Sequence, residues 1–155
     1  MAIFMAYEGI DGEHTINETA GYIKLESFSW GMSRSSTSVR PSLRSRIEPS
    51  VLEVSCTKLT DGSSVALLTE ALTGKFDRTV TLQFMRQGTG GLMPYLTYSL
   101  YDAGVTSFNH SGGGEGTPME AFTLNFAAID FKYTVYSDDL TGIPSNILYN
   151  VPDGQ

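Results

Sequence analysis

The chain has 155 residues and a net charge of −7, and 41% of its residues are hydrophobic while 17% are charged. This length suits one domain, over residues 1–155, with a substantial core. The acidic balance argues against general nucleic-acid binding, which needs positive charge near the phosphates, and the single cysteine, Cys56, excludes an internal disulfide and a thiolate-rich zinc site.

The N-terminal third predicts two strands, the second of which changes its pattern. Residues 2–9 form an apolar run that suits a strand buried on at least one face. In residues 21–31 the apolar parity switches between Leu25 and Phe28. Such a switch predicts a bulge, or a face that passes from core to interface. Trp30 is then either a core residue or an interface anchor, because Trp is enriched at interfaces.

Residues 31–49 have neither a helical nor a strand period, and they hold four of the ten basic residues. Compact domains rarely keep an irregular loop this long unless it binds something or is disordered. We predict a basic arm that contacts the acidic surface of another copy of the chain. The candidate interface residues are Arg34, Arg40, Arg44 and Arg46 on the arm, and Glu8, Asp11, Glu13 and Glu18 in the acidic turn.

One helix is predicted, over about residues 63–73. Residues 60–64 supply several oxygens that can cap a helix N-terminus. Val65, Leu68 and Leu72 then recur at the i, i+3, i+7 spacing of one helical face.

The rest of the chain is predicted to be β structure with polar connections. Strand patterns cover residues 78–86, 94–111, 119–128 and 129–137, and the second of these is expected to bend at Ala103-Gly104. Residues 138–155 contain two prolines and few apolar residues, so a loosely attached tail is expected. Seven or more strands with one short helix predict a mainly β sandwich or barrel.

The N-terminus predicts no targeting segment. It lacks a basic region and already contains Glu8, unlike a Sec signal peptide. No apolar run approaches the roughly 18–20 residues that span a bilayer. We expect a soluble protein that is made and folded in the cytosol, without membrane insertion.

The titratable residues form no pattern typical of catalysis or of metal binding. His14 and His110 both lie in polar stretches, where histidines are more often solvated than ligands. Cys56 lies on the apolar face of a strand and suits the core better than a nucleophilic role. Asp61 is better placed to cap the helix than to transfer protons. The Gly-rich residues 112–116 lead into a strand, unlike a phosphate-binding loop. We predict no enzymatic activity, no metal and no cofactor.

Four segments, in this order along the chain, resemble parts of one known family. They are GIDGE (9–13), IKLESFSWGMS (23–33), TKLTDGSS (57–64) and EAFTLNF (120–126), the last followed by a Lys132-Tyr133 strand. Together they resemble the haemolysin-coregulated protein (Hcp) family, the tube subunits of bacterial type VI secretion, over about residues 1–137. The arm is richer in Arg and Ser than the loop of many relatives, and Val65 stands where proline is common.

The resemblance implies a compact two-sheet β-barrel with one short α-helix and a long protruding loop. It implies a homo-hexameric ring, rings stacked into a tube that works with sheath and spike proteins, and small effector proteins held in the lumen. It further implies assembly in the cytoplasm followed by secretion without a Sec signal peptide. Ser27 and Ser29, which alternate with Phe28 and Trp30, are the candidate lumen residues.

Ring formation also agrees with the charge pattern, because a cyclic ring joins two different patches on neighbouring copies. A basic arm facing an acidic turn meets that requirement and would set the register. Two alternatives stay open. One is a phage-type tail-tube protein, and the other is a monomeric β-barrel that binds a small ligand at Tyr95, Tyr98 and Tyr101.

Overall fold

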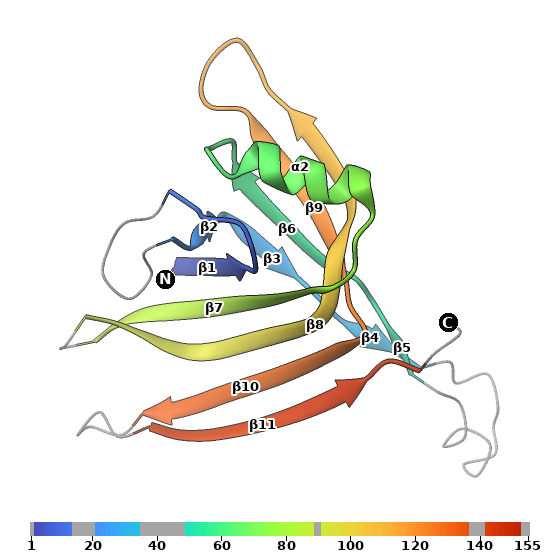
Figure 1. Cartoon of the computed structure of the whole chain (residues 1–155). Helices are drawn as coiled ribbons and strands as arrows, with labels where there is room; N and C mark the ends of the chain where they lie inside the picture. Colours follow the sequence, from blue (N-terminus) through green and yellow to red (C-terminus); the bar gives the residue numbers. More distant parts are fainter. Residues whose placement is uncertain (1, 14–20, 35–48, 89–90, 137–141, 153–155) are drawn as a thin grey trace.

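The computed structural model describes residues 2–13, 21–34, 49–88, 91–136 and 142–152 (Figure 1). Within these ranges the chain is mainly β, as predicted, with one short helix, α2 (Ser64–Thr73). The strands are β1 (Ala2–Tyr7), β2 (Ile23–Leu25), β3 (Ser27–Ser29), β4 (Met32–Ser33), β5 (Ser50–Val51), β6 (Val54–Leu59), β7 (Arg78–Gly88), β8 (Gly91–Ser111), β9 (Met119–Asn125), β10 (Ala128–Tyr136) and β11 (Gly142–Asn150).

The strands form two antiparallel layers that share β8. The first layer runs β2-β1-β7-β8-β10-β11, and the second runs β8-β9-β6-β3. Among the described residues no ladder joins the far edge of one layer to that of the other. The predicted two-sheet architecture is therefore present, and the two sheets are not closed into a continuous barrel among the described residues. The layers meet through side chains, and at the β2–β3 crossing a single hydrogen bond links Glu26 N to Thr57 O at 2.8 Å.

The parity switch before Trp30 marks the point where the chain changes layer. β2 pairs with β1 in the first layer, whereas β3 pairs with β6 in the second. Ile23 and Leu25 are buried on one side of the crossing, and Phe28 packs into the core on the other. The parity switch is thus a crossover between sheets, and not the bulge or the passage from core to interface that the sequence predicted.

β8 bends where the sequence predicted, at Ala103-Gly104. Up to Ala103 it pairs with β7, and from Gly104 it pairs with β9. A Cβ at Gly104 would lie 2.1 Å from the carbonyl oxygen of Lys75, so only glycine fits without a backbone shift. This close approach lets one strand serve both layers.

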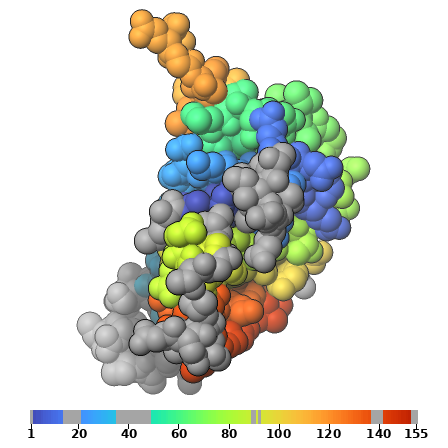
Figure 2. All heavy atoms as spheres, turned by 90° about the vertical axis from the view of Figure 1, so that its left-hand side faces the viewer, coloured from blue at the N-terminus to red at the C-terminus, as the bar shows by residue number. Residues whose placement is uncertain are grey.

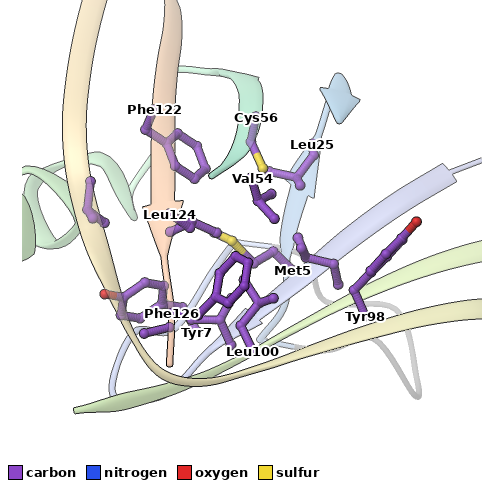
Figure 3. Close-up of a cluster of buried hydrophobic side chains, with 14 of the residues drawn as sticks. Met5, Tyr7, Leu25, Val54, Cys56, Tyr98, Leu100, Phe122, Leu124 and Phe126 are labelled. Atoms are coloured by element: carbon purple, nitrogen blue, oxygen red, sulfur yellow. The ribbon is translucent and has the colours of Figure 1, made fainter. Parts of the chain in front are cut away.

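The core fills the space between the layers (Figure 3). Met5, Leu82 and Tyr98 are register neighbours on β1, β7 and β8, and they face residues such as Cys56 and Phe122 of the second layer. Burial of each large apolar side chain contributes about 1.5–3 kcal/mol. Cys56 is a core residue, as predicted, and burial raises the pKa of its thiol to about 12.

Helix α2 forms where it was predicted but turns its aliphatic stripe outwards. It ends at Gly74, which adopts a left-handed φ of 66° and donates its N–H to Glu70 O. The buried side chains are Leu67 and Glu70, whereas the predicted stripe of Val65, Leu68 and Leu72 is exposed. The i, i+3, i+7 spacing therefore identified a helix without identifying its core face.

The C-terminal region corrects a second expectation. Instead of a loosely attached tail, residues 142–150 form β11, which pairs with β10 along its whole length from Ala128↔Asn150 to Tyr136↔Gly142. β11 is an edge strand, and this position tolerates Pro144, whose missing N–H would break an interior ladder.

The connector between β8 and β9 projects from the body, as both views show (Figures 1 and 2). It includes Gly113 and Gly114, around which no heavy atom lies within 4 Å of an added Cβ. It leads into strand β9, as the sequence predicted.

Candidate functional site

The outer face of the second layer is covered by small neutral side chains, which we call the hydroxyl face. Two rows of register neighbours cross β3, β6, β9 and β8 in turn. The alternate residues of the same strands, Phe28, Cys56 and Phe122, point into the core. The hydroxyl face comprises Ser29, Ser55, Thr123 and Ser107 in one row and Ser27, Thr57, Ala121 and Asn109 in the other.

Hydroxyl groups on this face bond to one another across strands. Ser27 Oγ lies 2.5 Å from Thr57 Oγ1, and Ser107 Oγ lies 2.6 Å from Thr123 Oγ1. Both predicted lumen residues, Ser27 and Ser29, are exposed here. The face offers water donors and acceptors, yet none of its eight side chains carries charge or a long aliphatic chain. Such a surface stays hydrated and offers only weak, non-specific contacts.

The predicted acidic turn is described in part, and one of its members, Glu8, has a partner within the copy. Glu8 Oε1 accepts from Thr79 N at 2.9 Å, which joins the end of β1 to β7. Asp11 and Glu13 are exposed, and a Cβ at Gly62 would lie 3.3 Å from the Glu13 carboxylate group. The turn therefore lies beside the loop that leads into α2, and Glu18 lies outside the described residues.

Most of the predicted basic arm lies outside the described residues. Arg34 is exposed at its beginning, while Arg40, Arg44 and Arg46 belong to the part that is not described, as does His14. The two ends of the arm are joined by β4 and β5, which pair Met32 with Val51. The arm thus begins and ends at one place on the molecule.

Trp30 lies between the core and the surface at the base of the arm. Its Nε1 donates to Leu52 O at 2.9 Å, and its ring lies 5.8 Å from that of Tyr98. It also lines an apolar hollow of about 180 Å³, which we call the hairpin groove. The lining includes Trp30, Val51, Ile129, Phe131, Ile147 and Tyr149.

A buried cluster of charges that the sequence analysis did not identify lies under the start of α2. Lys58 and Glu120 are both fully buried and directly opposite each other on β6 and β9. Lys58 Nζ donates to Glu120 Oε1 at 2.9 Å, to Asp61 Oδ1 at 2.9 Å and to Ser64 Oγ at 3.2 Å. The sequence did carry a signal for this cluster. Lys58 continues the apolar alternation of Val54 and Cys56, and Glu120 continues that of Phe122 and Leu124, so both charges fall on core-facing positions.

This cluster positions the helix rather than performing chemistry. Asp61 Oδ1 also accepts from Ser63 N and Ser63 Oγ, so Asp61 organises the turn before the helix while Ser63 is the N-cap residue. Partial burial opposes ionisation of Asp61, but the hydrogen bonds from Ser63 and Lys58 outweigh it and lower its pKa. His110 Nε2 lies 2.7 Å from Thr60 Oγ1 and supports the same loop.

The three tyrosines of the ligand-binding alternative do not converge on one site. Tyr98 is buried against Phe28 and Phe131, with ring centroids at 4.8 Å and 5.1 Å. Tyr101 is exposed, and the ring of Tyr95 makes an edge-to-face contact with that of Tyr133, with the centroids 6.3 Å apart.

The described part of the chain shows neither a metal-binding cluster nor a membrane-spanning helix. No group of three or more His, Cys, Asp or Glu residues there is arranged to hold a metal ion. None of the helices found there has the length and apolar character needed to cross a bilayer.

Comparison with known proteins identifies the family and the fold. The chain matches the family model "Type VI secretion system effector, Hcp" over residues 4–133. Its fold is similar to a solved type six secretion system protein (TM-score 0.83, 21% identity, covering 97% of this chain and 95% of that one). It is also similar to Hcp1 from Salmonella typhimurium (TM-score 0.77, 22% identity, covering 96% of this chain and 93% of that one). A type VI secretion system effector from Yersinia pestis is similar as well (TM-score 0.75, 21% identity, covering 96% of this chain and 99% of that one).

A search of curated proteins by sequence found no match. The structural similarities, all near 21% identity, establish the fold, with two packed sheets and a flanking helix. The family model covers most of the chain, from β1 into β10. The chain therefore belongs to the Hcp family of type VI secretion proteins, whose role is structural rather than enzymatic.

Proposed function

We propose that this chain forms hexameric rings that stack into the inner tube of a type VI secretion system, with the hydroxyl face lining the lumen. Small effector proteins travel in that lumen, and sheath and spike proteins act on the tube from outside and at its tip. The rings assemble in the cytoplasm and leave the cell with the tube, without a Sec signal peptide. Membership of a type VI secreted family supports this.

The hydroxyl face is the observation that carries the proposal. It spans four strands of one sheet, and its eight side chains are small and neutral. A channel that moves protein cargo needs a hydrated wall with weak, non-specific contacts. Ser27 and Ser29 lie at the β3 edge of that wall.

Contacts between the basic arm and the acidic turn would set the register of the ring. A ring joins two different patches on neighbouring copies, and opposite charges select the partner patch more than they add affinity. Arg34 at the start of the arm and Asp11 and Glu13 in the turn are all exposed on a single copy.

Assembly is tested by native mass spectrometry and by negative-stain imaging of the full chain. We expect a hexamer and ring-shaped particles, whereas a strictly monomeric species at high concentration would contradict the proposal. Replacing Arg40, Arg44 and Arg46 with Glu should weaken assembly or stacking. Unchanged assembly of that variant would show that the arm does not join the copies.

The lumen assignment is tested by thiol accessibility. In rings of a Ser29→Cys variant, the new thiol should react with N-ethylmaleimide but only slowly with a maleimide attached to a large globular protein. Glu115→Cys, in the projecting connector, is the control that should react with both reagents. Equal reaction of the two variants with the large reagent would place the hydroxyl face outside the channel. Buried Cys56 contributes no background.

A further inference from the structure

Two apolar surfaces have no covering partner among the described residues of one copy, and we propose that they are the two halves of one contact between copies. In this contact the aliphatic stripe of α2 (Val65, Leu68 and Leu72) on one copy lies in the hairpin groove of the next. The inference rests on the proposed function in one respect, namely that copies of the chain assemble.

The stripe is unusual for the solvent face of a helix. Val65 and Leu72 are each 78% exposed and Leu68 is 40% exposed, and the exposed Phe76 follows just beyond the helix end. The only charged residue within α2, Glu70, points inwards, where its Oε1 accepts from Arg78 Nε at 2.9 Å. A surface helix ordinarily places charge outwards and apolar residues inwards. A solvent face without charge and with three aliphatic side chains is typical of an interaction surface.

The second apolar surface is the continuation of the core face of the first layer. Phe131 on β10 is the register neighbour of buried Tyr98 on β8 and of Ile147 on β11. Val135 pairs with Ile143 farther along the same face, and both are exposed. The core-facing side of the first layer therefore extends beyond the area that the second layer covers. The hairpin groove lies at the boundary between the covered and the exposed parts of that side.

The two surfaces lie at opposite ends of the molecule. Both views place α2 (green) at one end of the long axis and the β10–β11 hairpin (red) at the other (Figures 1 and 2). They are therefore too far apart to cover each other within one copy. In a head-to-tail array every stripe meets the groove of a neighbour, which is the heterologous arrangement that a ring requires.

The shapes and chemistry of the two surfaces are complementary. A row of aliphatic side chains at i, i+3 and i+7 on a helix is the standard way to fill an apolar groove. The named lining residues of the groove are all apolar or aromatic, and the stripe is also neutral, so their contact would bury no charge. A partner of a different kind, such as a sheath protein, would need only one of the two surfaces, whereas a second copy explains both.

Cysteine cross-linking tests this pairing directly. Leu72→Cys and Ile147→Cys place one thiol on each surface, and Cys56 is buried and does not compete. When the two single variants are mixed and oxidised as assembled protein, we expect cross-linked dimers in the mixture and few in either variant alone. Dimers from Leu72→Cys alone would mean that the stripe pairs with itself, which overturns the proposal.

The same experiment separates this inference from the proposed function. Rings that form without a cross-link between positions 72 and 147 would overturn the stripe-and-groove contact while leaving ring assembly intact. A wild-type chain that stays monomeric by native mass spectrometry would overturn both.

Charge insertion gives a second, independent test with matched controls. Leu72→Lys and Ile147→Lys should lower the assembled fraction at least tenfold. Thr73→Lys, the adjacent exposed position on α2, and Leu148→Lys, on the opposite face of β11, should leave it unchanged. Circular dichroism and thermal unfolding confirm that each variant is folded. Equal effects of Leu72→Lys and Thr73→Lys, or of Ile147→Lys and Leu148→Lys, would contradict the proposal.

Discussion

Charged side chains are usually exposed and apolar ones buried, and two regions of this molecule depart from that rule. The cluster around Lys58 buries charge, whereas the hairpin of β10 and β11 exposes apolar side chains. In the first, Lys58 and Glu120 are fully buried and ion-paired at 2.9 Å. In the second, Val135, Ile143 and Ile147 are exposed on a continuation of the core face. The comparison shows that Lys58 and Glu120 pair with each other within one copy, whereas no described residue covers the exposed apolar side chains of the hairpin. The first region therefore serves the fold, and the second is suited to assembly.

The largest effect on the fold is expected from Glu120→Gln, which leaves Lys58 buried without its full counter-charge. Breaking a buried ion pair in this way costs about 3–5 kcal/mol. Urea unfolding of the variant measures the loss, and Lys132→Ala on the exposed face of β10 is the control, with a change within about 0.5 kcal/mol. A loss below about 1 kcal/mol for Glu120→Gln would show that water reaches the pair.

A second large effect is expected where β8 changes layer. Gly104→Ala places a Cβ against the carbonyl oxygen of Lys75 and forces the backbone apart. The overpacking should cost about 1–3 kcal/mol in the free energy of unfolding. Gly113→Ala, in open space on the connector, is the matched control and should be nearly neutral. Equal stability of the two variants would mean that the sheet crossing is not tightly packed.

A pH-dependent loss of stability is expected from Asp61. Hydrogen bonds from Ser63 and Lys58 lower its pKa in the folded state despite partial burial, so the folded chain favours the ionised form. The resulting stabilisation is present above the ordinary aspartate pKa of about 3.9 and is lost as pH falls through the lower folded value. Asp61→Asn should lower the free energy of unfolding at neutral pH. Between about pH 2 and 6, a range that brackets the ordinary aspartate pKa, its free energy of unfolding should depend less on pH than that of the wild-type chain. If the variant loses stability in acid as steeply as the wild-type chain, the pH dependence comes from other carboxylates.

The smallest effect on the fold is expected in the hairpin. Ile147→Lys removes a side chain that is 66% exposed, so the free energy of unfolding under monomeric conditions should change by less than about 0.5 kcal/mol. The same substitution should strongly reduce assembly. A loss of stability comparable to that of Glu120→Gln would show that Ile147 contributes to the monomer core, and the contrast between the two regions would disappear.

Several features of the fold followed from local patterns alone. The helix at 64–73, the bend at Gly104 and the core position of Cys56 depend on capping, spacing and alternation, which act over a few residues. The tail was misjudged because the pairing of β11 with β10 depends on a neighbouring strand rather than on local apolar content. The aromatic strand and the junction at 57–64 indicated the family before the fold was known.

The sequence by itself determined the β character, the helix at 64–73 and the absence of a catalytic pattern, because each depends on residue type and period. Only the tertiary structure decided which faces are covered. Val65, Leu68 and Leu72 have the period of a core-facing stripe, yet they point outwards because Leu67 and Glu70 contact the body instead. Lys58 and Glu120 look like surface charges in the sequence, yet they are buried because β6 and β9 place them opposite each other beneath the helix. Periodicity defines which residues share a face, but the packing of distant elements determines what that face meets.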